Sequence, residues 1–175
     1  MKLHQRIDID NLDTIIPKIK TYLERKNLIK TSYVGYILLN KTDIILYCPE
    51  LFQSFLKLGL SISTVAIYRT TNNTQSEVHI DNTPYQCRIN IPIMNCENTS
   101  TVFYTATNDE MEEQDYNNLT FVKCKDPVEI DRVTIDRPTI LRVNAPHRVI
   151  MDETRSPRIC LTVRCEPDPE ILLTD

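Results

Sequence analysis

The segment His79–Ile93 reads HIDNTPYQCRINIPI and decides the fold. Apolar and polar side chains alternate in its second half, which predicts a β-strand with one apolar and one polar face. The alternating residues are the apolar Cys87, Ile89, Ile91 and Ile93 and the polar Arg88 and Asn90. A polar face inside a small β domain is costly unless its groups are paired, so we interpret it as the wall of a binding cavity.

The first half of this segment carries two side chains that can bind a metal, His79 and Asp81. They are two residues apart, so in an extended chain both point to the same side. His147 adds a second imidazole later in the chain. Two imidazoles and a carboxylate can hold a metal on one face and leave positions open for the oxygen chemistry of Fe(II). Because 3 histidines and 24 acidic residues give about 0.4 chance matches to His-x-Asp/Glu, the pattern depends on its context.

Outside this segment the chain divides into a helical first third and a run of strands. Helical spacing of apolar residues predicts a helix over 12–28, with Pro17 in its first turn, and a second helix from Pro49 to Gly59. A short apolar run predicts a strand at 34–39. Runs rich in Ile, Val, Thr and Tyr predict further strands at 62–69, 77–81, 86–93, 101–106, 119–124, 128–135, 139–144 and 158–165.

Helices followed by strands indicate an α+β fold that is mainly β, in which the helices pack on one sheet of a sandwich or barrel. The 175 residues suit one hydrophobic core, so we expect one domain over 1–175. Within it, residues 1–59 form a helical support, 60–167 the β core and 168–175 a tail. The end of the core and the start of the tail, 166–170, are expected to be extended and to take no part in chemistry.

The last predicted strand supplies a candidate anchor for an anion. Arg158 shares a face with Thr162, while Leu161 points the other way. An arginine in a cavity requires an anionic partner, and the planar guanidinium of Arg158 matches the distal carboxylate of 2-oxoglutarate. Tyr68, Tyr104 and Thr162 are further candidates for the cavity wall, although a tyrosine in a strand is more often part of the core.

Three segments together resemble a known superfamily. They are HIDNTPYQCRINIPI at 79–93, APHRV at 145–149 and PRICLTVR at 157–164. With these motifs, residues 60–167 resemble the 2-oxoglutarate/Fe(II)-dependent oxygenases. Within that superfamily they look most like the aspartyl/asparaginyl β-hydroxylase-like group, which includes small phage and viral members. The resemblance implies a double-stranded β-helix of the jelly-roll or cupin-like type.

The resemblance also implies roles for individual residues. His79, Asp81 and His147 would bind Fe(II), Arg158 would bind 2-oxoglutarate, and Arg88 would make a second contact to it.

Three positions bear on how closely the chain follows this group. The mammalian aspartyl/asparaginyl hydroxylase lacks the carboxylate ligand that Asp81 supplies here. Asn90 stands where that enzyme has a histidine, and Cys160 stands where many relatives have serine or threonine. The substrate class is therefore less well indicated than the metal site.

The reaction implied is hydroxylation of a C–H bond with Fe(II), 2-oxoglutarate and O2. The first substrate hypothesis is an Asp or Asn side chain of a protein or peptide, with a small molecule or a nucleobase as alternatives. Two other classes stay open: a non-catalytic cupin-like or jelly-roll binding or structural protein, and a metal enzyme that does not use 2-oxoglutarate. The acidic segment 109–115 lies in a long polar connection and predicts a solvated loop or, alternatively, a lid over the substrate.

Composition argues against several other classes. Hydrophobic residues make up 41% and charged residues 25%, as in ordinary folded proteins, and no stretch approaches the roughly 18 apolar residues of a membrane span. The formal charge of -4 argues against general nucleic-acid binding. The 6 cysteines form no Cys-x-x-Cys pair and accompany no secretory signal, so they are expected to be reduced. We therefore expect a cytoplasmic protein without a membrane partner, and the resemblance admits a phage or viral source.

Overall fold

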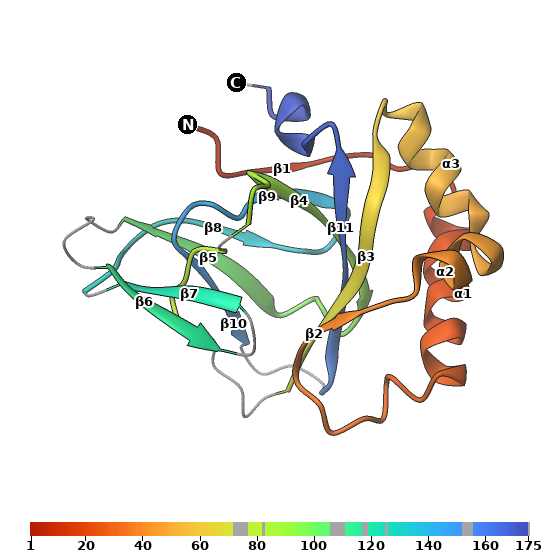
Figure 1. Cartoon of the computed structure of the whole chain (residues 1–175), viewed down its shortest axis with the longest axis horizontal. Coiled ribbons are helices and arrows are strands. Elements are labelled where there is room, and N and C mark those ends of the chain that lie inside the picture. The colour runs from red at the N-terminus through yellow and green to blue at the C-terminus, as the bar shows by residue number, and fades with distance from the viewer. Residues whose placement is uncertain are drawn as a thin grey trace.

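The structure is a computed structural model that describes residues 1–71, 77–81, 83–105, 111–116, 119–124, 126–151 and 156–174, with backbone alone described for 111–116 and 119–124. The described helices, except for a short one near the C-terminus, lie in the first third of the chain together with two short strands, and the other strands follow (Figure 1). The sequence prediction of a mainly β protein with a few N-terminal helices is confirmed.

Three helices form the N-terminal support: α1 (Leu12–Arg25), α2 (Lys41–Tyr47) and α3 (Pro49–Lys57). The prediction that Pro17 lies in the first turn of α1 is wrong, because α1 begins at Leu12 and Pro17 lies one turn further in. Proline has no N–H, so the helix continues there without the hydrogen bond to the carbonyl of Asp13. Helix α2 was not predicted; the Asn40 side chain begins it by accepting a hydrogen bond from the backbone N–H of Asp43 at 3.0 Å.

Strands make up the remainder. Their bounds are β1 (His4–Arg6), β2 (Gly35–Leu38), β3 (Ser61–Thr70), β4 (Cys87–Met94), β5 (Thr99–Thr105), β6 (Met111–Tyr116), β7 (Leu119–Cys124), β8 (Val128–Thr134), β9 (Thr139–Arg142), β10 (His147–Met151) and β11 (Arg158–Glu166). A short 3-10 helix, η2 (Pro169–Leu172), follows β11. Within the described residues the strands pair antiparallel in three sheets: β1-β9-β4-β11-β3-β2, β10-β5-β8 and the hairpin β6-β7.

Several sequence predictions need correction. The predicted strand 77–81 is reduced to one isolated bridge at His79, and β1 and β10 were not predicted. Both are short and paired by neighbours far away in the chain, which a local pattern does not show. The predicted acidic loop 109–115 is also wrong for its described part, because residues 111–116 form strand β6; residues 109 and 110 lie outside the described residues.

The end of the chain is likewise not an extended tail. The Asp168 carboxylate accepts a hydrogen bond from the Glu170 N–H at the start of η2. It also accepts one from the Gln86 backbone N–H at 2.6 Å, which ties the C-terminus to the beginning of β4. The two chain ends lie on the same side of the molecule (Figure 1).

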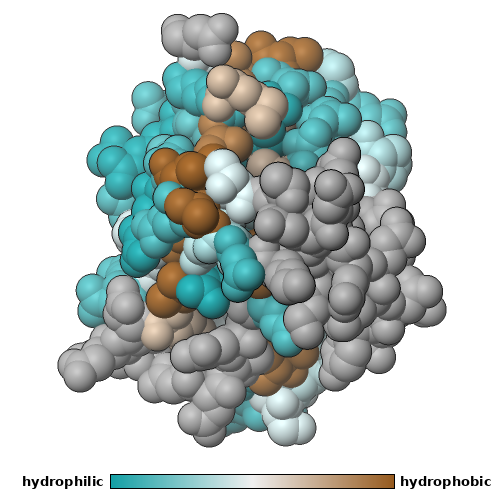
Figure 2. Space-filling view, turned by 90° about the vertical axis from the view of Figure 1, so that its left-hand side faces the viewer, coloured by the Kyte–Doolittle hydropathy of each residue, from teal (hydrophilic) through white to brown (hydrophobic). Residues whose placement is uncertain are grey.

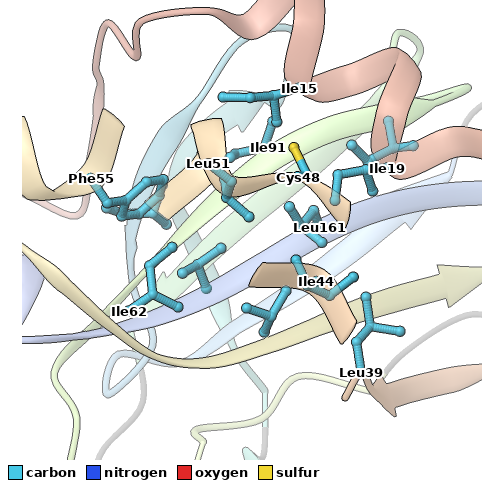
Figure 3. Packing of buried hydrophobic residues seen from close by; sticks show 14 of the residues in the cluster. Ile15, Ile19, Leu39, Ile44, Cys48, Leu51, Phe55, Ile62, Ile91 and Leu161 are labelled. Carbon is cyan, nitrogen blue, oxygen red and sulfur yellow. The ribbon is translucent and has the colours of Figure 1, made fainter. Parts of the chain in front are cut away.

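The three helices cover one face of the six-stranded sheet (Figures 1 and 3). Ile19 of α1 and Phe55 of α3 are fully buried and face Ile91 and Leu161 of the central strands. Each large aliphatic or aromatic side chain buried in this way contributes about 1.5–3 kcal/mol. This layer is the main hydrophobic core, and its apolar positions on β4 and β11 are those predicted from the alternation.

The other face of the six-stranded sheet meets the three-stranded sheet. A second apolar cluster includes Phe103, Leu141 and Cys160 from the two sheets. The opposite side of β5 packs separately, with Val102 and Tyr104 beside Val78. The outer surface near these strands mixes hydrophilic residues with a broken strip of hydrophobic ones (Figure 2). Among the helices of the described residues, none has the length and apolar character needed to cross a membrane.

Candidate metal centre

His79 and His147 are held together by their own backbones. His147 opens β10, and the two residues form an isolated antiparallel bridge. The His79 N–H donates to the His147 carbonyl at 2.9 Å, and the His147 N–H donates to the His79 carbonyl at 2.8 Å. Directly opposed residues in an antiparallel pair place their side chains on the same side, and the two ring centroids lie 4.5 Å apart.

Asp81 reaches the same place two residues further on. Its backbone N–H donates to the Val143 carbonyl at 3.0 Å, and its carbonyl accepts from the Thr83 N–H in a tight turn. One carboxylate oxygen, Oδ2, pairs with the guanidinium of Arg88 at 2.7 Å. The other, Oδ1, lies 3.6 Å from Nε2 of His79. The ion pair therefore orients the carboxylate so that one oxygen faces the imidazoles.

The hydrogen bonds of the two rings fix their tautomers. Nδ1 of His79 lies 2.8 Å from the Glu77 carbonyl, and Nδ1 of His147 lies 2.9 Å from the Ala145 carbonyl. A carbonyl oxygen only accepts, so both Nδ1 atoms carry a hydrogen, and in the neutral form of each ring Nε2 carries the lone pair. Histidines that bind a metal through one ring nitrogen usually donate a hydrogen bond from the other nitrogen, as Nδ1 does here.

The three side chains meet the geometric requirements of a metal site. The ligand atoms of His79, Asp81 and His147 all lie within 4.8 Å of one another. Neighbouring ligands of an octahedral ion, each about 2.1 Å from the metal, lie about 3 Å apart. A closure of less than about 2 Å therefore brings this set to the spacing that a bound ion requires. Two imidazoles and one carboxylate are the donor set of the facial triad that holds non-haem Fe(II).

Electrostatics also prepare these groups for a cation. Burial lowers the pKa of His147 to about 4, and His79 acts in the same direction, so the ring is neutral near pH 7. Burial raises the pKa of Asp81, but the charge of Arg88 and the neighbouring imidazoles outweigh burial, and the net pKa lies below its ordinary value. A neutral imidazole beside a carboxylate anion is the protonation state that binds a metal.

Arg158 lies at the start of β11 and is 1% exposed, so it is fully buried. Its Nε donates to Oγ1 of Thr99 on β5 at 2.9 Å. Within the described part of the chain no carboxylate lies at ion-pair distance from its guanidinium. A buried cation without an anion is strongly unfavourable, which is why buried arginines are normally paired. Among the described residues Arg158 therefore has a hydroxyl group, and no carboxylate, as its side-chain partner.

Tyr68 and Thr162 stand on the same face of the six-stranded sheet as Arg158. Tyr68 is opposite Cys160, and Thr162 is opposite Ala66 on one side and Asn90 on the other. Burial raises the pKa of Tyr68, while the charge of Arg158 lowers it and that of Asp81 raises it. The Tyr68 hydroxyl thus lies within electrostatic reach of both groups.

Tyr104 does not join this set. It belongs to the cluster on the opposite side of β5, where its hydroxyl accepts a hydrogen bond from Nε of Arg148 at 2.8 Å. Its place as a cavity residue is therefore a wrong prediction. Successive residues of a strand point to opposite faces. Because Phe103 faces the space between the sheets, Tyr104 faces away from it.

Sequence reasoning missed several polar groups of this space. Thr99 holds Arg158, and the hydroxyl oxygens of Thr70 and Thr101 are buried without a hydrogen-bond partner among the described residues. The same is true of Oδ1 of Asn90, whose place on the polar face was predicted. Buried polar atoms are normally paired, so a group of such oxygens beside Arg158 indicates a space that water or a ligand fills. Thr99 and Thr101 alternate with Phe103, but alternation alone does not tell which face of β5 is turned inward.

Comparison with known proteins gives similarity to solved structures only. No family model matches the chain, and no curated protein matches it. One similar structure is a non-haem monooxygenase, ThoJ, in a nickel complex, at 11% identity with a TM-score of 0.45, covering 93% of this chain and 71% of that one. Another is a truncated viral collagen prolyl hydroxylase, vCPH, from Paramecium Bursaria Chlorella virus-1, at 12% identity with a TM-score of 0.40, covering 93% and 88%.

Proposed function

We propose that this chain is a non-haem Fe(II)- and 2-oxoglutarate-dependent oxygenase built on a double-stranded β-helix. The observation that carries the proposal is the meeting of two groups in one space between two sheets. One is the triad of His79, Asp81 and His147, and the other is the fully buried Arg158. A metal site alone fits many proteins, but a metal site together with a buried arginine that has no described carboxylate partner suits a metal-chelating acid as co-substrate.

Each residue has a defined task in this proposal. His79 and His147 present Nε2 to the metal, and Asp81 presents Oδ1 while Arg88 holds Oδ2. Arg158 takes the distal carboxylate of 2-oxoglutarate, with its Nε fixed by Thr99. Tyr68 and Thr162 line the wall between these two ends.

When bound, Fe(II) and 2-oxoglutarate supply an oxidation in which O2 is divided: one oxygen atom enters the substrate C–H bond, and the other enters the succinate left when the keto acid loses CO2. The protein contributes orientation and a sheltered, weakly hydrated site for this chemistry. The substrate that we propose first is an Asp or Asn side chain of a protein or peptide, as in the aspartyl/asparaginyl β-hydroxylase-like group.

The experiment that tests the function does not need the substrate. Purified protein is incubated with Fe(II), 2-oxoglutarate, O2 and ascorbate, and slow substrate-free formation of succinate is measured. We expect turnover that requires added Fe(II), is lost in Asp81→Ala, and in Arg158→Ala is recovered only at much higher 2-oxoglutarate concentrations. His4→Ala is the matched control, because His4 lies outside the triad and pairs with Asp131 at the surface.

Absence of Fe(II)-dependent succinate in the wild type, combined with failure of 2-oxoglutarate to bind, would favour a binding or structural protein. Tight metal binding without any effect of Arg158→Ala on 2-oxoglutarate would instead favour a metal enzyme that uses another co-substrate.

A further inference from the structure

Two cysteines meet on the face of the six-stranded sheet that is turned away from the helices. Cys160 lies on β11 two residues after Arg158, so the two side chains point to the same face. Cys96 follows β4, and its thiol donates a hydrogen bond to the carbonyl of Ile159 at 3.2 Å. Both cysteines are free, belong to one buried cluster and are hydrogen-bond partners of each other.

The turn that carries Cys96 also supports Arg158. The Cys96 carbonyl accepts a hydrogen bond from the Thr99 hydroxyl at 2.8 Å, and the oxygen of that hydroxyl accepts one from Nε of Arg158 at 2.9 Å. The preceding residue, Asn95, ties the turn to β11, because its Nδ2 donates to the carbonyl of Pro157 at 2.7 Å. The position of Cys96 is therefore coupled to that of the Arg158 guanidinium through one threonine hydroxyl.

The two thiols differ in how readily they ionise. The hydrogen bond from Cys160 lowers the pKa of Cys96 to about 6 although burial opposes it, and the charge of Arg158 acts in the same direction as the hydrogen bond. The hydrogen bond to Cys96 and burial raise the pKa of Cys160. A thiolate is the form of cysteine that reacts with oxidants, and a neighbouring thiol then resolves the product. Cys96 is suited to the first role and Cys160 to the second.

Cys87 and Cys165 have the opposite character. Both are fully buried among the apolar residues of the helix-covered core. Burial raises the pKa of each thiol to about 12. Such thiols stay protonated near pH 7 and react slowly with oxidants, so they provide an internal control for the pair on the other face.

We propose that Cys96 and Cys160 form a redox-active dithiol, which hydrogen peroxide converts to a disulfide that weakens co-substrate binding at Arg158. In the first step the Cys96 sulfur bonds to one OH group of the peroxide, the O–O bond breaks, and the other oxygen leaves as hydroxide and takes up a proton. In the second step the Cys160 sulfur bonds to the Cys96 sulfur, the S–O bond breaks, and the OH group leaves as water with the Cys160 proton. Two thiols are thus oxidised to one disulfide, and one peroxide is reduced to two water molecules.

The disulfide changes the support of Arg158. A disulfide holds two sulfurs about 2.05 Å apart, which is closer than a hydrogen bond allows. Cys96 therefore moves towards β11 when the bond forms, and the Thr99 hydroxyl that its carbonyl accepts from moves with it. Since the same hydroxyl fixes Nε of Arg158, the guanidinium loses its present position. This effect on the co-substrate rests on the proposed function, whereas formation of the disulfide does not.

The first test maps the bond. Metal-free whole protein is treated with hydrogen peroxide, freed of it, alkylated and digested, and the linked peptides are identified by mass. We expect one intrachain disulfide between Cys96 and Cys160, reversed by dithiothreitol, lost in Cys96→Ala and in Cys160→Ala, and retained in Cys87→Ala. The wild type alone suffices to map it, so a folding defect in a variant does not affect the result. Absence of this disulfide, or an equal yield of linkages through Cys87 or Cys165, would overturn the inference.

The second test measures the effect on binding. Reduced and oxidised protein are loaded with Mn(II) and titrated with 2-oxoglutarate by calorimetry. We expect oxidation to weaken binding by about threefold or more, the size of one weakened hydrogen bond, and dithiothreitol to restore it. Cys87→Ala should respond as the wild type does, and Cys96→Ala should not respond to peroxide.

Equal affinities of the reduced and oxidised wild type, with the disulfide formed, would overturn the proposed effect on the co-substrate. If the reduced protein does not bind 2-oxoglutarate at all, the proposed function fails, and the mapped bond by itself upholds or overturns the dithiol.

Discussion

The two faces of the six-stranded sheet are built by alternate residues of the same strands and are opposite in character. On β11, Leu161 is buried among the apolar residues that the helices cover. Arg158 and Thr162 are also buried, on the other face, which combines polar groups with the apolar Phe103, Leu141 and Cys160. The helix-covered face stabilises the protein by removing apolar area from water, whereas the polar face costs stability. This difference is the reason that we propose a binding role for the polar face.

The largest expected effect on the proposed binding role of the polar face comes from removing a metal ligand. We expect His147→Ala to lower metal affinity by more than about 100-fold, since changes at residues that only orient a ligand already cost about 10–100-fold. Metal binding is measured by competition with a chelator, and turnover by succinate formation. His4→Ala should retain both activities, and equal metal affinity in His147→Ala and the wild type would contradict the proposed ligand set.

A substitution on the helix-covered face is expected to lower the stability of the protein. Leu161 is fully buried, and Leu161→Ala should lower the free energy of unfolding by about 2–5 kcal/mol through lost burial and a residual cavity. Urea unfolding of the metal-free protein measures the change. The protein that remains folded should still bind Fe(II). A loss below about 1 kcal/mol would show that this face is not the main core.

For a substitution at Arg158 we expect the reverse of the Leu161→Ala result, with ligand binding weakened and stability retained. Arg158→Met should weaken 2-oxoglutarate binding by about tenfold or more, because it removes the charged hydrogen-bonding fork. It should leave the free energy of unfolding of the unliganded protein unchanged or higher, since an apolar side chain replaces a buried cation without a described anionic partner. Binding and unfolding are measured on the same preparation. A large loss of stability would mean that Arg158 is a structural residue.

The smallest expected effect concerns Thr99, whose hydroxyl accepts the Arg158 Nε hydrogen bond. Thr99→Val keeps the side-chain shape and removes this acceptor, at a cost of about 0.5–1.5 kcal/mol in 2-oxoglutarate affinity. Equilibrium binding at several temperatures measures it. Thr105→Val is the comparison, since Thr105 lies at the exposed end of the same strand and should not affect binding.

Periodicity along single segments was enough to predict much of the fold. The alternation in β4 and β11 identified the two faces correctly, and apolar spacing located α1 and α3. Strands β1 and β10 were not predicted, because each depends on a partner that is distant in the sequence: β1 pairs with β9, and β10 pairs with β5. Three or five residues carry too little pattern to be recognised without the strand beside them.

The candidate site likewise has a part that the sequence predicted and a part that it did not. His79, Asp81 and His147 could be grouped from residue chemistry and order, and the structure brings their donor atoms together. The pairing of Arg88 with Asp81 could not be predicted, because it depends on how β4 is placed against the turn after residue 81. Tyr104 was misplaced for a similar reason: the local pattern does not reveal which side of β5 is inward.

The most direct test of the proposed oxygenase is an anaerobic titration of the purified protein with Fe(II) and then 2-oxoglutarate, followed by visible absorbance. A keto acid that chelates Fe(II) gives a weak charge-transfer band. The proposal predicts that this band appears in the wild type, is absent in His147→Ala, and requires more 2-oxoglutarate in Arg158→Met. Absence of the band at saturating Fe(II) and 2-oxoglutarate, or an unchanged band in His147→Ala, would contradict it.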